Sequence, residues 1–400
     1  MPRVLLTEGE QRSTLAVARS LGRAGFEILV SSSTGRSISG ACRYVEQDLV
    51  TPKVMADPTG HARAISRIIR RHRVDALIPM TDASGSVLLG LRADHPDLLI
   101  PLPDVRTWLA ASDKAALTDL ARTLSIPVPR QVTLQSSDDS GWQDWAPDRY
   151  PIIVKPHRSV VFDGARLLHG PVGIGYDETS TRELLRDLPP DCYPVLLQER
   201  IVGPGRGAFF LVDRGVITAS FAHKRIREKP PTGGVSVLRE AVAIRDDIRE
   251  YSERLLSELG WSGVAMVEFK EDAETGTPYL MEINARFWGS LQLAIDAGVD
   301  FPAYLMAQVG LLDGRRAGDS LETGVRTRWL LGDLDHLIWM LKAPAWKRAE
   351  YGLGSRLSAA REFLTSAGPH TRLEVLRGDD ARPFVREATA WVRDLLGLGR

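Results

Sequence analysis

The chain has 400 residues, of which 44% are hydrophobic and 26% charged, and its 51 basic and 51 acidic side chains give a formal net charge of zero. This length is sufficient for two or three domains with substantial cores, and the balanced charge gives no indication of a nucleic acid or membrane partner. Cys42 and Cys192 lie far apart without CxxC spacing, so we expect neither a disulfide framework nor a zinc site, and a cytoplasmic location. No apolar run approaches the ~18 residues of a membrane-spanning helix, and Glu8 and Glu10 precede any signal-like run.

Short apolar runs alternate with helix-like segments over the first hundred residues. The runs are VLLT, FEILVSS, VDALIPM and LLIPLP, and helical patterns pass through Leu15 and Leu21 to Gly25 and through residues 65–69. This βαβ rhythm predicts a parallel sheet covered by helices over residues 1–110.

The loops that follow these strands give weak functional signals. The first, TEGEQRS, lacks the GxGxxG pattern and carries two glutamates, which argues against a dinucleotide site. Arg12, Thr81 and Asp82 are candidates for an acceptor-substrate site, although ordinary turn chemistry explains each of them better.

A new unit begins near Ser112. The segment SDKAALTDLARTLSIPVPR has apolar residues at helical spacing, and Pro127 ends the pattern. Lys114 lies in the first turn, where a cation opposes the helix dipole unless an anion shares the site. Anion binding and simple exposure on the surface explain this lysine equally well.

The next apolar strand, PIIVKP, ends in Lys155, and a buried lysine requires a charged partner. A strand VGIGYDE follows, and the loop between the two strands contains His157, Arg158, Gly164, His169 and Gly170. Such a glycine-bearing loop could cover phosphate groups as a mobile lid.

Two further strands carry polar groups. Gln198 and Glu199 interrupt the apolar run PVLLQERIV, which a glycine-rich turn follows. In ITASFAHKRIREKPPTGGVSV, basic side chains lead into a glycine pair, so an anion site is favoured over a solvated basic loop. The basic side chains are those of His223, Lys224, Arg225, Arg227 and Lys229.

The most informative stretch consists of two strands, VAMVEFK and PYLMEIN, joined by the polar loop EDAETGTP, which is typical of a hairpin. Strict alternation predicts that Leu280, Glu282 and Asn284 share one face. Pairing of the strands would bring Glu268 against Glu282 and Asn284. Three oxygen donors in this arrangement suit Mg²⁺, and Arg286 adds positive charge for an oxyanion or phosphoryl group.

The alternative is a solvated hairpin face, in which Glu and Asn are ordinary residues. Two features favour the metal site. Glu268 lies in an otherwise apolar strand, and the segment NAR that starts at Asn284 leads straight into a helix. Leu291, Ala294 and Ile295 mark the core side of that helix, and Gly298 is its expected C-cap.

The signals weaken past Gly310. A helical stripe predicts a helix that packs against the core, with a substrate lid or a homodimer face as the weaker alternatives. The stripe consists of Leu334, Leu337, Ile338 and Leu341. The segment ARPFVREATAWVRDLLG predicts one more amphipathic helix.

The segment LMEINARFWGSLQLAIDAGVDFP resembles the metal-binding segment of the ATP-grasp superfamily, to which biotin carboxylase, carbamoyl-phosphate synthetase and D-alanine:D-alanine ligase belong. The resemblance implies a mixed α/β and α+β fold in four parts. These are a Rossmann-like pre-ATP-grasp domain (1–110), a small ATP-grasp subdomain (111–195), a metal-binding catalytic subdomain (196–310) and a mostly helical C-terminal extension (311–400).

The same resemblance implies roles for residues. Mg²⁺, or Mn²⁺ as an alternative, would be held by Glu268, Glu282 and Asn284. The transferred phosphate would face Arg286, with Lys224 and Arg225 as further catalytic candidates. ATP would be bound by Lys114 and Lys155 at the phosphates and by Gln198, Glu199 and Ile201 around adenine. The ribose partner stays open, because GPGRG stands where an acidic residue is usual.

We therefore predict an ATP- and Mg²⁺-dependent carboxylate–amine ligase that forms an acyl phosphate and releases ADP and phosphate. Its partners would be small-molecule carboxylate and amine substrates, without nucleic acid or membrane. One alternative is another acyl-phosphate-forming enzyme of the superfamily, a carboxylase or carbamoyl-phosphate type. The other is a non-enzymatic nucleotide-binding regulator, which would not require a complete set of metal ligands.

Overall fold

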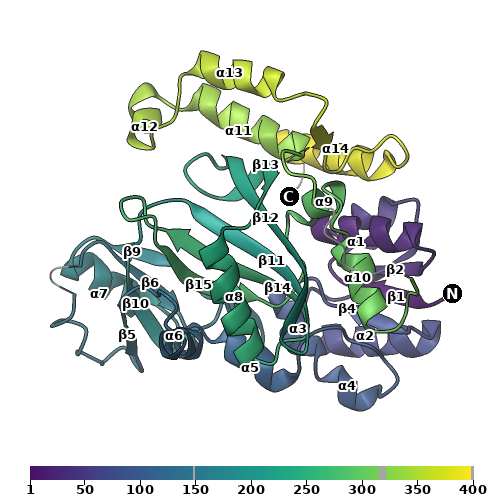
Figure 1. The fold of residues 1–400 in the computed structure, drawn as a ribbon, viewed down its shortest axis with the longest axis horizontal. Helices are drawn as coiled ribbons and strands as arrows, with labels where there is room; N and C mark the ends of the chain where they lie inside the picture. Colours follow the sequence, from purple (N-terminus) through teal and green to yellow (C-terminus); the bar gives the residue numbers. More distant parts are fainter. Residues whose placement is uncertain (147–148, 315–320, 398–400) are drawn as a thin grey trace. The chain divides into compact units, whose positions relative to one another are not determined.

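The computed structural model describes residues 1–146, 149–314 and 321–397, and Figure 1 shows their helices and strands. The chain forms two compact units that are discontinuous in sequence. The first unit contains residues 1–50, 219–244 and 288–400, and the second contains residues 51–218 and 245–287. The predicted domain boundaries at residues 110, 195 and 310 stay predictions.

The first unit begins with three parallel strands, β1 (Arg3–Leu6), β2 (Glu27–Ser32) and β3 (Val45–Val50), with β2 paired to both others. Helix α1 (Arg12–Arg23) connects β1 to β2 and packs against two later helices, α9 and α10. The side chains of β1 and β2 are almost entirely buried, which is why their apolar runs predicted them. Strand β3 was missed because VEQDLV has no apolar run and none of its residues is fully buried.

A second group of strands in the first unit comprises β12 (Val216–Lys229), β13 (Val235–Val242), β16 (Arg326–Arg328) and β17 (Thr371–Leu373). Strand β13 pairs antiparallel with both β12 and β16, and β17 pairs parallel with β16. The helices of this unit are α9 (Leu291–Asp296), α10 (Phe301–Gln308), α11 (Leu330–Lys342), α12 (Ala345–Glu350), α13 (Arg356–Thr365) and α14 (Arg382–Leu395), with the short 3-10 turn η1 (Ser39–Ala41).

Helices α11 and α14 confirm the two C-terminal helices that the sequence predicts. The expected burial of α11 is only partly found, because Leu334, Leu337 and Ile338 are half-buried and Leu341 is exposed. Helix α9 starts at Leu291, so the predicted direct entry from Asn284 is wrong by several residues. Gly298 follows its C-cap with a φ of 95°, in the left-handed region that favours glycine.

The second unit starts with α2 (Pro58–His72), β4 (Ala76–Ile78), α3 (Asp82–Leu88), α4 (Leu91–Asp94) and α5 (Val105–Ser112). The predicted strand LLIPLP is wrong, since it makes only one isolated bridge, between Leu99 and Ala76. Pro101 and Pro103 lack the N–H group that a sheet ladder requires, which explains why the apolar run does not extend the sheet.

A four-stranded antiparallel sheet in the second unit has the order β5 (Gln131–Leu134), β10 (Val195–Glu199), β6 (Ile152–Pro156), β9 (Gly173–Gly175). Its core contains Trp142, Ile152 and Leu197. Helices α6 (Lys114–Thr123) and α7 (Glu178–Asp187) and the 3-10 turn η2 (Pro190–Cys192) accompany it. A small hairpin, β7 (Val160–Phe162) and β8 (Leu167–His169), is found where the sequence predicted a loop.

The remaining strands of the second unit are β11 (Gly205–Asp213), β14 (Gly263–Glu271) and β15 (Pro278–Asn284), with helix α8 (Asp246–Glu258). Strand β14 pairs antiparallel with both β11 and β15. The predicted hairpin at residues 264–284 is therefore present. None of the helices within the described ranges is long and apolar enough to cross a membrane.

Candidate functional site

The β14–β15 hairpin brings the predicted metal ligands together. Glu268 is paired directly with Glu282, and Met266 is paired with Asn284, so both carboxylates and the amide lie on one face. The register shifts between Glu282 and Leu280, which pairs with Phe269. The prediction that Leu280 shares the face of Glu282 is therefore wrong.

A β-bulge at Met281 is the physical reason for this difference. Two residues of β15 there oppose one residue of β14, which reverses the alternation on the N-terminal side of the bulge. Leu280 and Phe269 are 3% and 2% exposed, respectively, and pack in the core. The bulge thus lets β15 bury Leu280 and still present Glu282 and Asn284 to the site.

Hydrogen bonds connect Glu282, Asn284 and Arg286 in a chain. The Asn284 Nδ2 donates to Glu282 Oε1 at 3.1 Å, and Arg286 Nη2 donates to Asn284 Oδ1 at 3.1 Å. Arg286 Nε also donates to Asp82 Oδ2 at 2.9 Å. Burial lowers the pKa of Arg286, but Asp82, Glu282 and Glu268 outweigh it and raise the pKa overall. Arg286 is therefore a fixed cation beside the carboxylates.

Lys114 is buried rather than exposed on the surface. It is the first residue of α6, whose N-cap is Asp113. Its Nζ donates to Ser159 Oγ at 2.7 Å and lies 3.5 Å from Glu282 Oε2. Burial raises the pKa of Glu282, but Lys114, the Asn284 hydrogen bond and other cations outweigh it and lower the pKa overall. Glu282 therefore stays ionised beside Lys114.

Lys155 lies at the end of β6 and is 8% exposed. The sequence pattern predicted a charged partner for this lysine. In the structure its Nζ donates a hydrogen bond to the neutral Gln198 Oε1 at 2.9 Å. Gln198 Nε2 in turn donates to Gln131 Oε1 at 2.9 Å. Burial, followed by Lys114, lowers the pKa of Lys155 to about 8, while Glu282 opposes the shift. Lys155 is therefore mostly protonated at pH 7, with the amide oxygen of Gln198 as its hydrogen-bond partner and Glu282 as a nearby opposite charge.

The other predicted adenine residues lie next to Gln198. Glu199 Oε1 accepts a hydrogen bond from the backbone N–H of Arg130 at 2.8 Å, so this carboxylate ties β10 to the chain before β5. Ile201 follows the strand and is half-buried. Their contact with adenine stays a prediction.

The basic cluster of β12 belongs to the first unit, and its cations contact carboxylates there. Lys224 is half exposed and lies 3.1 Å from Glu240, and Arg225 lies 3.3 Å from Glu228. Arg227 forms a bidentate pair with Asp333, at 2.7 and 2.6 Å. A structural role therefore explains Arg227 fully, whereas Lys224 and Arg225 remain accessible candidates.

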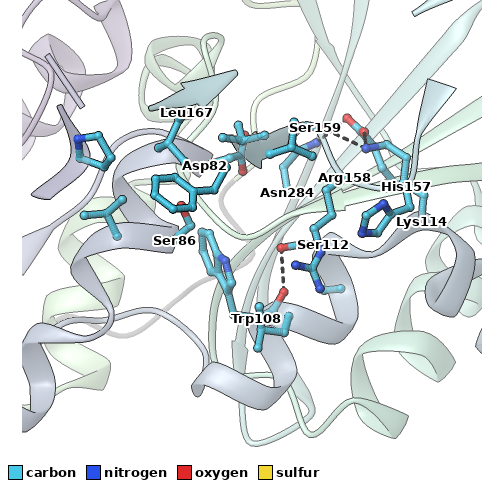
Figure 2. Close-up of a pocket in the computed structure, with 18 of the residues that line it drawn as sticks. Asp82, Ser86, Trp108, Ser112, Lys114, His157, Arg158, Ser159, Leu167 and Asn284 are labelled. Carbon is cyan, nitrogen blue, oxygen red and sulfur yellow. Dashed lines mark hydrogen bonds and ion pairs between the residues drawn. The ribbon is translucent and has the colours of Figure 1, made fainter. Parts of the chain in front are cut away.

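Two adjoining pockets lie in the second unit. The larger has a volume of about 660 Å³, and the smaller, of about 300 Å³, is lined by Lys155, His169 and Gly170. Both pockets are also lined by Lys114, Arg158, Ser159 and Glu282. Figure 2 shows Trp108, Ser86 and Leu167 on one side of the larger pocket and Lys114 and His157 on the other.

Arg158 was predicted only as part of the loop that could cover phosphate groups, without a role of its own. It is half-buried, and its Nε is buried without a hydrogen-bond partner. A guanidinium in this state at the junction of two pockets is suited to binding an anion. Its position three residues after Lys155 on the predicted lid was the one signal that could have indicated it.

Within the described ranges, no group of three or more His, Cys, Asp and Glu side chains could hold a metal ion. The predicted set is of another kind, since it combines two carboxylates with the amide oxygen of Asn284.

Comparisons with known proteins bear on the fold. The family model described as "ATP-grasp in the biosynthetic pathway with Ter operon" matches residues 211–331. L-amino acid ligase from Bacillus licheniformis is 15% identical, with a TM-score of 0.59 over 78% of this chain and 74% of the ligase. N5-carboxyaminoimidazole synthetase from Staphylococcus aureus, complexed with ADP, is 15% identical, with a TM-score of 0.58 over 81% of this chain and 80% of that protein. The biotin carboxylase–βγ-ATP complex from Campylobacter jejuni is 14% identical, with a TM-score of 0.61 over 81% and 74%.

This chain has the ATP-grasp fold, which confirms the resemblance and the mixed α/β and α+β class predicted from the sequence. The family model covers residues 211–331 of this chain, and the similar structures, which include ligases, agree with it in fold.

Proposed function

We propose that this protein is a cytoplasmic, Mg²⁺-dependent carboxylate–amine ligase that activates a carboxylate as an acyl phosphate and releases ADP and phosphate. The observation that carries the proposal is the polar chain Lys114–Glu282–Asn284–Arg286, which begins at the junction of two pockets. It combines oxygen donors and fixed cations, as phosphoryl transfer requires.

The metal would be held by Glu268, Glu282 and Asn284. Two carboxylates placed directly opposite each other on neighbouring strands repel, and a divalent cation between them would remove that repulsion. All three donors are hard oxygens, which favour Mg²⁺, with Mn²⁺ as the alternative. When bound, the metal would neutralise negative charge on the phosphates during transfer.

The cations around the smaller pocket would bind the nucleotide phosphates. Lys114, Lys155 and Arg158 line it, and Lys155 connects it through Gln198 to β10, where adenine would lie. Because a phosphate group stabilises the protonated form of a lysine, Lys155 would be fully charged when ATP is bound.

The proposed reaction has two steps. A carboxylate oxygen attacks the γ-phosphorus of ATP, the bond to the β–γ bridging oxygen breaks, and ADP leaves. An amine then attacks the acyl carbon, phosphate leaves, and the nitrogen loses a proton to give an amide. Arg286 would hold the phosphoryl oxygens, and we retain Lys224 and Arg225 as further candidates for this role.

The test is ADP release from MgATP in the presence of pooled carboxylates and amines. Glu282→Gln should reduce turnover by at least about a hundredfold, because it removes a metal ligand and the partner of Lys114. Glu274→Gln is the matched control, since Glu274 is an exposed carboxylate in the loop of the same hairpin. Full activity of Glu282→Gln at limiting Mg²⁺ would exclude the metal assignment, and ADP release stimulated by bicarbonate alone would favour a carboxylase.

A further inference from the structure

The larger pocket has an apolar wall that the metal and phosphate chemistry does not use. Helix α5 contributes Trp108 and Leu109, and the β7–β8 hairpin contributes Val161, Phe162 and Leu167. On the other side of the pocket Figure 2 shows the charged or polar residues Lys114, His157 and Arg158, and Glu282 also lines the pocket. The pocket is therefore amphipathic, with one end for an ionic group and one for an apolar group.

Two residues of this wall are exposed although they are large and apolar. Phe162 is 54% exposed and Leu109 is 45% exposed. Covering such surface with an apolar ligand group is favourable by about 25 cal/mol for each Å² removed from water. An aromatic and an aliphatic side chain exposed within one concave pocket indicate a surface that a ligand covers.

The wall is held in place by the fold. Leu167 is buried against Val54 and Ala83, and its backbone N–H donates to the carbonyl of Met55 at 2.9 Å. The hairpin turn is closed by Asp163 Oδ1, which accepts from the N–H groups of Ala165 and Arg166. This segment is thus a built structure that presents Val161 and Phe162 to the pocket.

The ionic end fixes which group of a ligand lies there. Arg158 and Lys114 also line the phosphate pocket, so a carboxylate beside them would be next to the γ-phosphate of bound ATP. The rest of the molecule would then extend toward Phe162. A volume of about 660 Å³ is within the range of pockets that enclose drug-sized ligands.

We infer that the carboxylate substrate of this enzyme carries a bulky apolar group, aromatic or branched aliphatic, which packs between helix α5 and the β7–β8 hairpin. The inference rests on the proposed ligase function for the orientation of the substrate. The apolar pocket itself is independent of that function.

The experiment compares 3-phenylpropionate with acetate as carboxylates in the ADP-release assay, with the same amine pool. In the native protein, 3-phenylpropionate should have a KM at least about tenfold below that of acetate. Phe162→Ala should raise the KM for 3-phenylpropionate about tenfold and leave kcat and the KM values for acetate and ATP unchanged. Tyr176→Ala is the matched control, because Tyr176 is an aromatic residue of the same unit, 66% exposed and outside both pockets.

A second variant changes the pocket in the opposite direction. Ser86 is an exposed residue of α3 that lines the pocket, so Ser86→Trp should fill it without disturbing the core. This variant should reject 3-phenylpropionate and keep acetate. Equal KM values for the two carboxylates, or a Phe162→Ala variant with native selectivity, would overturn the inference while leaving the ligase function intact.

The assay also distinguishes failure of the proposed ligase function from failure of this inference. If no carboxylate stimulates ADP release, the ligase proposal fails, and calorimetric binding of 3-phenylpropionate in the presence of MgADP then decides the inference. Binding that Phe162→Ala weakens and Tyr176→Ala does not would support the apolar pocket. Absence of binding to the native protein would reject it.

Discussion

Lys155 binds its proton less tightly in the folded protein than an ordinary lysine does. Its pKa is about 8, whereas an ordinary lysine has a value of 10.5. Between these two pH values the unfolded chain binds the proton and the folded chain does not, so the contribution of Lys155 to the free energy of unfolding increases as the pH rises. Below about pH 8 the buried charge lowers that free energy by a constant amount.

Nucleotide binding should reverse this shift. If phosphates approach Lys155, its pKa rises and MgADP binding near pH 8 takes up protons, whereas near pH 6 Lys155 is already charged. Calorimetry in two buffers of different ionisation enthalpy measures the uptake directly. Lys155→Met should abolish the uptake that depends on this lysine and weaken MgADP binding. Identical heats in both buffers for the native protein near pH 8 would remove Lys155 from the site.

For single residues, the sequence predicted which residues form the site better than it predicted the face of the sheet on which each side chain lies. Glu268 and Glu282 were paired correctly because a glutamate in an apolar strand has few structural explanations. Leu280 was placed on the wrong face because the bulge at Met281 has no signature in the local pattern. Arg158 was named only as part of the predicted lid, because an arginine in a polar loop has no distinctive signal until the pocket around it is known.

Helix α6 shows how an element positions a site residue. Asp113 caps it by accepting from the backbone N–H groups of Ala115 and Ala116, at 3.0 and 3.1 Å. The cap fixes the first turn and with it Lys114, whose Nζ then reaches Ser159 and Glu282.

Asp113→Ala should reduce the free energy of unfolding by about 1 kcal/mol, because two N–H groups lose their acceptor. Asp113→Asn keeps an acceptor oxygen and should be close to native. Urea denaturation followed by circular dichroism measures the difference. A loss of equal size in both variants would show that charge, and not capping, makes Asp113 stabilising.

Helices and strands with a strong apolar pattern were predictable from the sequence. Strands that form only because they pair with a neighbouring strand were not. Strands β1 and β2 are almost continuously buried, and helix α1 is buried at every position from Ser13 to Leu21. Strand β3 is recruited by its neighbour β2 in spite of a polar sequence, and the β7–β8 hairpin is too short to give a periodic signal. The two prolines of LLIPLP were visible in the sequence and should have counted against a strand.

At the scale of the whole molecule, the two units consist of separate stretches of chain. In the first unit, the guanidinium of Arg19 is 1% exposed and bonds to Asp380 Oδ2 at 2.9 Å, and it also donates to the carbonyls of Glu374, Val375 and Asp380. One side chain of α1 therefore ties the start of the chain to its last segment.

Arg19→Met should lower the free energy of unfolding by about 3–5 kcal/mol, because it leaves the Asp380 carboxylate buried without its partner. Arg23 offers a matched control on the same helix, since its pair with Asp379 is exposed at both ends. Arg23→Met should change the free energy by less than about 1 kcal/mol. Equal effects of the two substitutions on the denaturation midpoint would contradict the stabilising role of the buried pair.

The Arg19–Asp380 pair also limits when the first unit can be completed during synthesis on the ribosome. The two residues are 361 positions apart, so at about 5–20 residues per second the carboxylate follows the guanidinium by roughly 20–70 s. During that interval α1 and its strands are outside the ribosome without the segment that completes their unit. The second unit, by contrast, ends at residue 287, so all of its residues are synthesised well before Asp380.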